Sequence, residues 1–97
     1  MLDIKNIKYE ETVISDMFGT ITMYFIAPKE ELKLLYPREY PEAESTEISI
    51  CFPADHIEPE YAYAEMSPTA NGSDYDWWEV TLTQDEIKSL IELAKAV

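Results

Sequence analysis

The basic residues of this chain are missing from its middle, and this constrains the fold more than any other feature. No Lys or Arg lies between Arg38 and Lys88, whereas the same interval holds thirteen of the chain's 20 Asp and Glu residues. The formal net charge is -13. The remaining residues sum to a net charge of zero, so this one continuous interval supplies the whole excess of negative charge.

Composition nevertheless indicates a folded protein. Hydrophobic residues make up 46% of the 97 positions, which separates the chain from disordered acidic segments. This length suits one domain spanning residues 1–97. One Cys and two Gly exclude a disulfide framework, a multi-cysteine zinc site and a glycine-rich phosphate loop.

The charge also limits the partners that can be expected. Nucleic acids and anionic membranes bind clustered Lys and Arg, which this chain does not offer. The longest apolar run, Met23–Ala27, is far shorter than the roughly 18 residues of a membrane span. We therefore expect a cytoplasmic protein without a cofactor, and a protein partner that is either basic or a second copy forming a homodimer.

The first half of the chain predicts a hairpin followed by a short helix. Ile7–Ser15 and Gly19–Ala27 are rich in β-branched and aromatic residues, and the second run alternates between two faces. Pro28–Tyr36 begins with proline and has acids in its first turn, as helices do, and Pro37 ends it. Residues 38–45 are expected to form a surface loop.

The second half predicts three strands and a helix. Thr46–Phe52 alternates, with Ile48 and its neighbours two residues apart on the apolar face. Tyr61–Met66 and Tyr75–Leu82 are expected to pair through a loop that contains both Pro and Asn-Gly turn signals. Thr83–Lys95 starts with a capping box and continues with an apolar stripe.

Together these elements predict an α+β fold in the order β-β-α-β-β-β-α. An antiparallel sheet of about five strands with both helices on one face satisfies this order. The other face of the sheet would then remain open.

The last predicted hairpin suggests what that open face carries. If its loop centres near Ala70, Tyr63 faces Trp77 and the neighbouring pairs combine aromatic with acidic side chains. Tyr and Trp are favoured anchors of protein interfaces. The alternative is that the loop at 38–45 or the first strand covers these rings. The candidate interaction face comprises Tyr61, Tyr63, Glu65, Tyr75, Trp77 and Glu79.

A second set of acids allows a different interpretation. Carboxylates on every second residue of a strand lie about 6.6–6.8 Å apart and can imitate the phosphates of a nucleic acid. The chain would then be a decoy or inhibitor of a basic DNA- or RNA-binding protein. The candidate acidic surface comprises Glu39, Glu42, Glu44, Glu47, Glu58, Glu60, Asp74 and Asp76.

Catalytic and metal-binding patterns are weak. Cys51 and His56 could form a thiolate-imidazole pair, but the surrounding acids would raise the pKa of a thiol. Asn71–Asp76 has oxygen ligands at alternate positions but fits no EF-hand register, so a turn is the simpler interpretation. We expect no catalytic residues and no metal site. The expected function is a non-catalytic protein-interaction or self-associating module.

Overall fold

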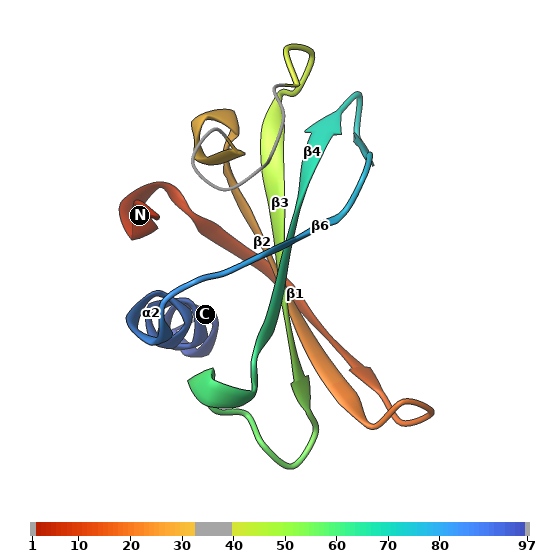
Figure 1. Cartoon of the computed structure of the whole chain (residues 1–97), viewed down its shortest axis with the longest axis vertical. Coiled ribbons are helices and arrows are strands. Elements are labelled where there is room, and N and C mark those ends of the chain that lie inside the picture. Colours follow the sequence, from red (N-terminus) through yellow and green to blue (C-terminus); the bar gives the residue numbers. More distant parts are fainter. Residues whose placement is uncertain (1, 33–39, 97) are drawn as a thin grey trace.

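In a computed structural model, which describes residues 2–32 and 40–96, the chain forms one antiparallel sheet and a C-terminal helix, α2 (Figure 1). The strands run β1-β2-β3-β4-β5 across the sheet, and β6 pairs with another part of β4. The strands are β1 (Lys8–Ser15), β2 (Thr20–Pro28), β3 (Ser45–Pro53), β4 (Tyr63–Ala70), β5 (Ser73–Asp74) and β6 (Trp78–Val80). The helical elements are α2 (Gln84–Lys95) and the 3₁₀ turns η1 (Ile4–Asn6), η2 (Lys29–Glu31) and η3 (Pro59–Tyr61). No helix in these described ranges is long and apolar enough to cross a membrane.

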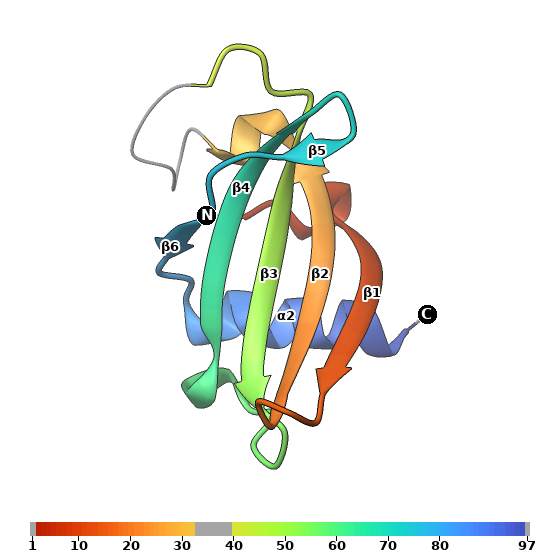
Figure 2. The ribbon, with the colours of Figure 1, turned by 90° about the vertical axis from the view of Figure 1, so that its right-hand side faces the viewer.

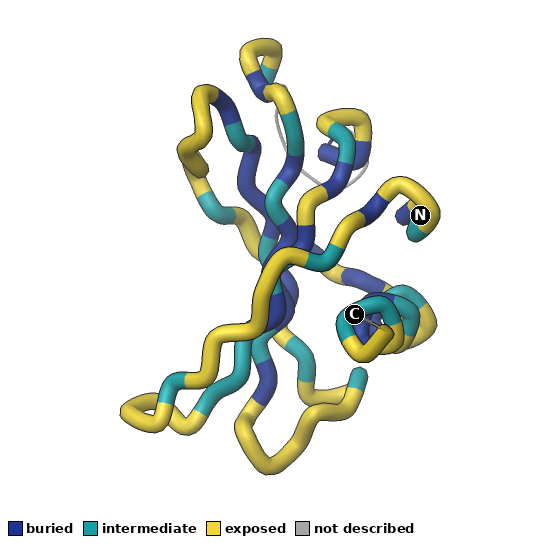
Figure 3. The backbone as a smooth tube through the Cα atoms, turned by 180° about the vertical axis from the view of Figure 1, so that it is seen from behind, coloured by how far each residue is buried: buried dark blue, intermediate teal, exposed yellow. Residues whose placement is uncertain are grey.

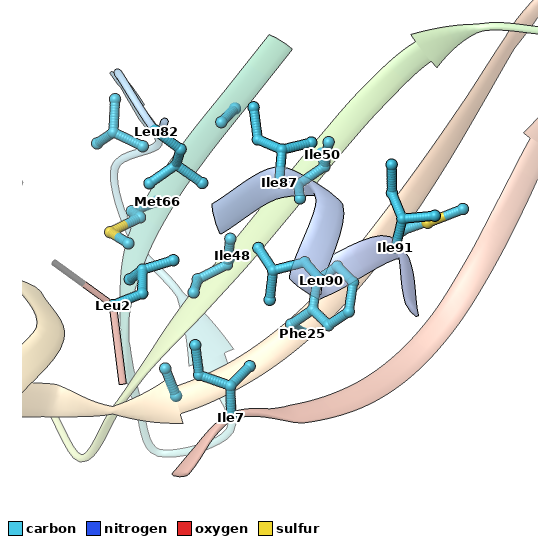
Figure 4. Packing of buried hydrophobic residues seen from close by; sticks show 14 of the residues in the cluster. Leu2, Ile7, Phe25, Ile48, Ile50, Met66, Leu82, Ile87, Leu90 and Ile91 are labelled. Atoms are coloured by element: carbon cyan, nitrogen blue, oxygen red, sulfur yellow. The ribbon is translucent and has the colours of Figure 1, made fainter. Parts of the chain in front are cut away.

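The hydrophobic core lies between α2 and one face of the sheet, here called the inner face (Figures 1 and 2). Alternation along β2 and β3 places Phe25, Ile48 and Ile50 on this face, where all three are fully buried. Leu90 of α2 is fully buried as well, and Figure 4 shows it beside Phe25. The predicted apolar faces of these two strands are confirmed.

A capping box begins α2, as the sequence predicts. The Thr83 Oγ1 accepts a hydrogen bond from the Glu86 backbone N–H at 3.1 Å, and the Glu86 carboxylate accepts one from the Thr83 N–H at 2.8 Å. Glu86 also accepts a bond from the Leu2 N–H at 2.7 Å. Partial burial opposes ionisation of Glu86, but the bonds from Leu2 and Thr83 outweigh it and lower its pKa.

We expect Thr83→Ala to lower the free energy of unfolding by about 1 kcal/mol, because an N–H at the helix start loses its acceptor. Urea denaturation measures this change. Thr81→Ala makes the same substitution at an exposed position outside the helix and should change stability by less than about 0.5 kcal/mol. Equal losses in the two variants would contradict a role for the cap.

The predicted helix at Pro28–Tyr36 is not confirmed. Pro28 is the last residue of β2, and its carbonyl accepts a hydrogen bond from Thr46 Oγ1 at 3.1 Å. This bond holds the proline in the sheet, so the predicted helix does not begin at Pro28; Lys29–Glu31 form the 3₁₀ turn η2, and Leu32 after it has helical backbone. Residues 33–39 lie outside the described part of the chain, as does the start of the loop expected at 38–45.

The last hairpin also differs from its prediction. The turn lies at Asn71 and Gly72, which both have positive φ, and not around Ala70 within a longer loop. A two-residue turn of this kind suits an Asn-Gly pair. It lets β4 continue through Pro68 and adds the short strand β5, so the sheet has six strands. β6 then pairs Glu65 with Glu79, which shifts the register away from the predicted one.

Candidate functional site

The face of the sheet opposite α2, here called the outer face, is not covered by any described helix (Figure 2). One row of paired residues crosses its centre from β2 to β6. This row consists of Tyr24, Ser49, Glu65 and Glu79, with Glu11 of β1 at its other end. Acidic and aromatic side chains therefore meet in the middle of the open face.

A hollow of about 430 Å³ lies over this row. The Trp77 ring comes from the segment between β5 and β6 and makes an edge contact with Tyr24, with 6.4 Å between ring centroids. Ser49 lies between these elements and is only 6% exposed. The lining residues are Glu11, Tyr24, Glu47, Ser49, Glu65, Asp74 and Trp77.

Two further carboxyl groups adjoin the hollow. Glu10 is hydrogen-bonded to Glu47, and Glu79 is hydrogen-bonded to Tyr63. We call the lining residues together with Glu10, Tyr63 and Glu79 the acidic face. Lys8 is the one Lys or Arg in the described strands, so the carboxyl groups of the acidic face have few cationic neighbours within the sheet.

The pKa of Glu47 shows how these carboxyl groups affect one another. Burial, the hydrogen bond with Glu10 and the negative charges of Glu10, Asp74 and Glu11 raise its pKa to about 9. At neutral pH the Glu47 carboxyl is therefore protonated, which relieves part of the repulsion among its neighbours. A cation placed beside Glu47 would favour the ionised carboxylate and lower its pKa.

The pKa values of Tyr24 and Tyr63, the two tyrosines of the acidic face, are also raised. Partial burial raises the pKa of Tyr24, and the charges of Glu11, Cys51 and Glu47 add to this effect. The pKa of Tyr63 is raised by its hydrogen bond with Glu79 and by the neighbouring carboxylates. Both phenols are therefore neutral and can present an O–H group or a ring face to a ligand.

The structure brings together four of the six residues of the candidate interaction face, namely Tyr63, Glu65, Trp77 and Glu79. Tyr61 and Tyr75 lie elsewhere. Tyr61 belongs to η3 and stacks on His56, with 4.6 Å between ring centroids. Tyr75 lies near Tyr40 at 5.2 Å, because its N–H bonds back to the β4 carbonyl of Pro68.

The candidate acidic surface is divided between different places. Glu47 and Asp74 belong to the acidic face. The others that the structure describes lie outside it: Glu42 and Glu44 before β3, Glu58 and Glu60 around η3 beyond the other end of β3, and Asp76 in the exposed segment before Trp77. Glu39 lies outside the described residues.

Sequence reasoning missed the contribution of the first hairpin to the site. Glu10, Glu11 and Tyr24 reach the acidic face because β1 and β2 continue the sheet beside β3. The pairing shifts between Tyr9 and Glu11, which marks a β-bulge. The period of two residues in the sequence of β2 places Tyr24 on the face opposite Phe25. This alternation is the sequence signal that could have identified Tyr24 as part of the site.

The residues considered for chemistry make other contacts. Cys51 is paired with Thr22 and Tyr63 in the sheet and is partly exposed. His56 lies 3.8 Å from Asp55 and 3.9 Å from Glu58. Within residues 2–32 and 40–96, no group of three or more His, Cys, Asp or Glu side chains could hold a metal ion.

No protein-family model, curated protein or solved structure matches this chain. The fold and the acidic face must therefore supply the functional argument on their own. They define an α+β chain with a helix-covered inner face and an open acidic outer face.

Proposed function

We propose that this chain is a non-catalytic, cytoplasmic protein-interaction module that binds a basic protein partner on its acidic face. The observation that carries this proposal is the open hollow itself. It places four carboxyl groups, those of Glu11, Glu47, Glu65 and Asp74, around two aromatic rings on an uncovered sheet. Surfaces of this kind favour ligands with complementary charge.

The aromatic rings support a Lys or Arg side chain as the anchoring group. Cations are attracted to the faces of Trp and Tyr rings, and this attraction adds to that of the carboxylates. The hollow holds Trp77 and Tyr24 beside the carboxyl groups. A partner that inserts Lys or Arg here satisfies both kinds of group at once.

Self-association through the acidic face has less support. Two copies docked face to face would oppose Glu11, Glu65 and Asp74 to the same residues of the other copy. Like charges in an interface are costly, and the described strands offer only Lys8 to offset them. The acidic face is therefore better suited to a basic partner than to itself.

The decoy interpretation also has less support than general basic-partner binding. Imitation of a phosphate backbone needs carboxylates in continuous spacing on one surface. Of the candidate acidic surface, Glu47 and Asp74 reach the acidic face, whereas Glu58 and Glu60 lie at the end of the sheet near η3. The decoy interpretation predicts that nucleic acid competes with this chain for its basic partner, and a competition experiment therefore distinguishes it.

The test uses a synthetic peptide of Lys and Arg as the probe and measures its affinity by calorimetry at low and high salt. The variant Glu11→Gln with Glu65→Gln removes two carboxylates from the hollow while keeping side-chain shape. We expect its affinity to fall about 10-fold, which corresponds to about 1.4 kcal/mol. Trp77→Ala should weaken binding further if the aromatic ring contributes.

A matched control separates a specific site from general attraction to a chain of charge -13. Glu58→Gln with Glu60→Gln removes the same charge from the region around η3, away from the hollow. We expect this control to weaken binding less than about 2-fold, because exposed distant charges are screened. Equal losses in the two double variants would show that the acidic face is not the binding site.

A further inference from the structure

The free edge of the sheet at β1 is the second unusual surface. Within residues 2–32 and 40–96, β1 pairs only with β2, and six of its eight residues are exposed. Figure 2 shows it as the outermost strand, and Figure 3 shows the exposed end of the β1–β2 hairpin projecting from the body. An uncovered edge presents backbone N–H and C=O groups that can pair with another strand.

The projecting end of this hairpin is apolar. Val13 is 44% exposed, Ile14 67%, Met17 86% and Phe18 77%. Val13 and Ile14 point to opposite faces of β1, and Met17 and Phe18 lie in the turn after it. Large apolar side chains left exposed at one end of a hairpin in this way mark an interaction surface. The group lies beside the free edge, so one partner strand could contact both.

This hairpin is also the part of the chain that carries least charge. Between Glu11 and Lys29 the only charged residue is Asp16, although the chain as a whole has a net charge of -13. Self-repulsion opposes association of two such chains wherever their acids meet. The part of the hairpin from Thr12 to Pro28, in which Asp16 is the one charged residue, is therefore the surface on which a second copy meets the least repulsion.

We propose that two copies of this chain associate by antiparallel pairing of their β1 edges around a two-fold axis at Thr12. This register places Lys8 of each copy beside Ser15 and Asp16 of the other, because the bulge between Tyr9 and Glu11 shifts the pairing there by one residue. It places Glu10 and Glu11 opposite the uncharged residues Ile14 and Val13. No acid is directly opposite an acid, and the two Val13 side chains lie on either side of the axis, whereas Met17 and Phe18 of the two copies lie at opposite ends of the paired strands.

The neighbouring registers are less favourable. An axis at Glu11 opposes Glu11 to itself, and an axis at Val13 opposes Glu10 to Asp16. The bulge at the start of β1 interferes least with an axis at Thr12 or beyond, because pairing is regular from Glu11 to Ser15. Among these registers, the axis at Thr12 is the one that forms two ion pairs.

Disulfide cross-linking tests the register. In a Cys51→Ser background, Thr12→Cys should form a covalent dimer under mild oxidation, because residues paired directly across antiparallel strands have Cβ atoms about 4.5–5.5 Å apart. Lys8→Cys is the matched control. Its two thiols would lie about 27 Å apart in the same dimer and should not cross-link.

A charge exchange tests the ion pairs without relying on cysteine. Analytical ultracentrifugation should show that Lys8→Asp weakens the dimer about 3- to 10-fold, as two exposed ion pairs become repulsive. Lys88→Asp causes the same change in net charge on α2 and should weaken it less. Lys8→Asp with Asp16→Lys keeps the net charge of the parent chain and should restore the dimer.

Several outcomes would overturn this proposal. These are a chain that stays monomeric up to millimolar concentration, equal cross-linking at positions 8 and 12, or a hairpin that binds lipid vesicles while the chain remains monomeric. None of them bears on the acidic face, because the residues substituted in the dimer tests, at positions 8, 12, 16 and 88, do not belong to it. Glu11 lies on both surfaces, so the Glu11 and Glu65 variant tests the acidic face and is not used to test the dimer.

Discussion

Replacing Phe25 by Ala is expected to lower the free energy of unfolding by about 3–5 kcal/mol. Phe25 is fully buried on the inner face, where it packs under α2 and makes an edge contact with Tyr9 at 5.7 Å. The substitution removes the ring and leaves a cavity that the strands on either side cannot close. Since small domains have about 5–15 kcal/mol of stability in total, much of the margin would be lost.

Thermal denaturation followed by circular dichroism measures this effect, and the chain supplies a matched control. Phe18→Ala makes the same substitution on a side chain that is 77% exposed, so its stability should change by less than about 0.5 kcal/mol. Both variants should be measured at low chain concentration, because Phe18 belongs to the proposed dimer surface. Similar losses in the two would contradict the assignment of the inner face as the core.

The elements whose signals are local could be predicted from the sequence. The alternation around Phe25 and Ile48 identifies β2 and β3 because one buried face requires a period of two residues. Thr83 and Glu86 identify the start of α2 because the capping box needs only four consecutive residues. These predictions hold to within one residue of the structure.

The last hairpin could not be predicted in detail because several turn signals compete. Pro68, Asn71 and Gly72 all favour a turn, and the sequence does not show that Pro68 is tolerated inside β4. The backbone carbonyl of Pro68 still accepts a hydrogen bond, from Tyr75, so the strand continues through it. The register of β6 depends on this choice, and so does the position of Tyr75.

The acidic face depends on contacts between residues far apart in the chain. Glu10 and Glu47 come together only because β1, β2 and β3 lie side by side and a bulge turns both Glu10 and Glu11 toward the outer face. The sequence shows where acids are dense. It does not show that Glu10 and Glu11 of the first hairpin join the acids that lie between Arg38 and Lys88.

The second large effect is a pH dependence of stability that comes from Glu47. Its pKa is raised from 4.5 to about 9 in the folded chain, whereas in the unfolded chain it has its ordinary value. Between these two pH values the folded chain holds a proton that the unfolded chain releases. The contribution of this group to stability is therefore fully present below pH 4.5 and is lost as the pH rises to about 9.

We expect the free energy of unfolding to fall by about 1–3 kcal/mol between pH 5.5 and pH 9. The full linkage would be about 1.4 kcal/mol for each pH unit, but Glu47 is only partly buried, and solvent screening reduces the effect. Urea denaturation at a series of pH values measures the slope. Glu47→Gln mimics the protonated carboxyl, so this variant should match the parent chain near pH 4.5 and exceed its stability by an amount that grows toward pH 9.

Glu92→Gln is the control for this experiment, because it removes one carboxylate from an exposed position on α2 and should leave the slope of the parent chain unchanged. A parent chain whose stability rises or stays constant above pH 5.5 would contradict the protonated state of Glu47.

The protonation of Glu47 also affects the proposed function. A Lys or Arg side chain placed in the hollow would lower the pKa of Glu47, so binding should release a proton and strengthen as the pH rises from 6 toward 9. Glu47→Gln should remove this pH dependence, whereas a basic partner bound elsewhere on the chain would retain it.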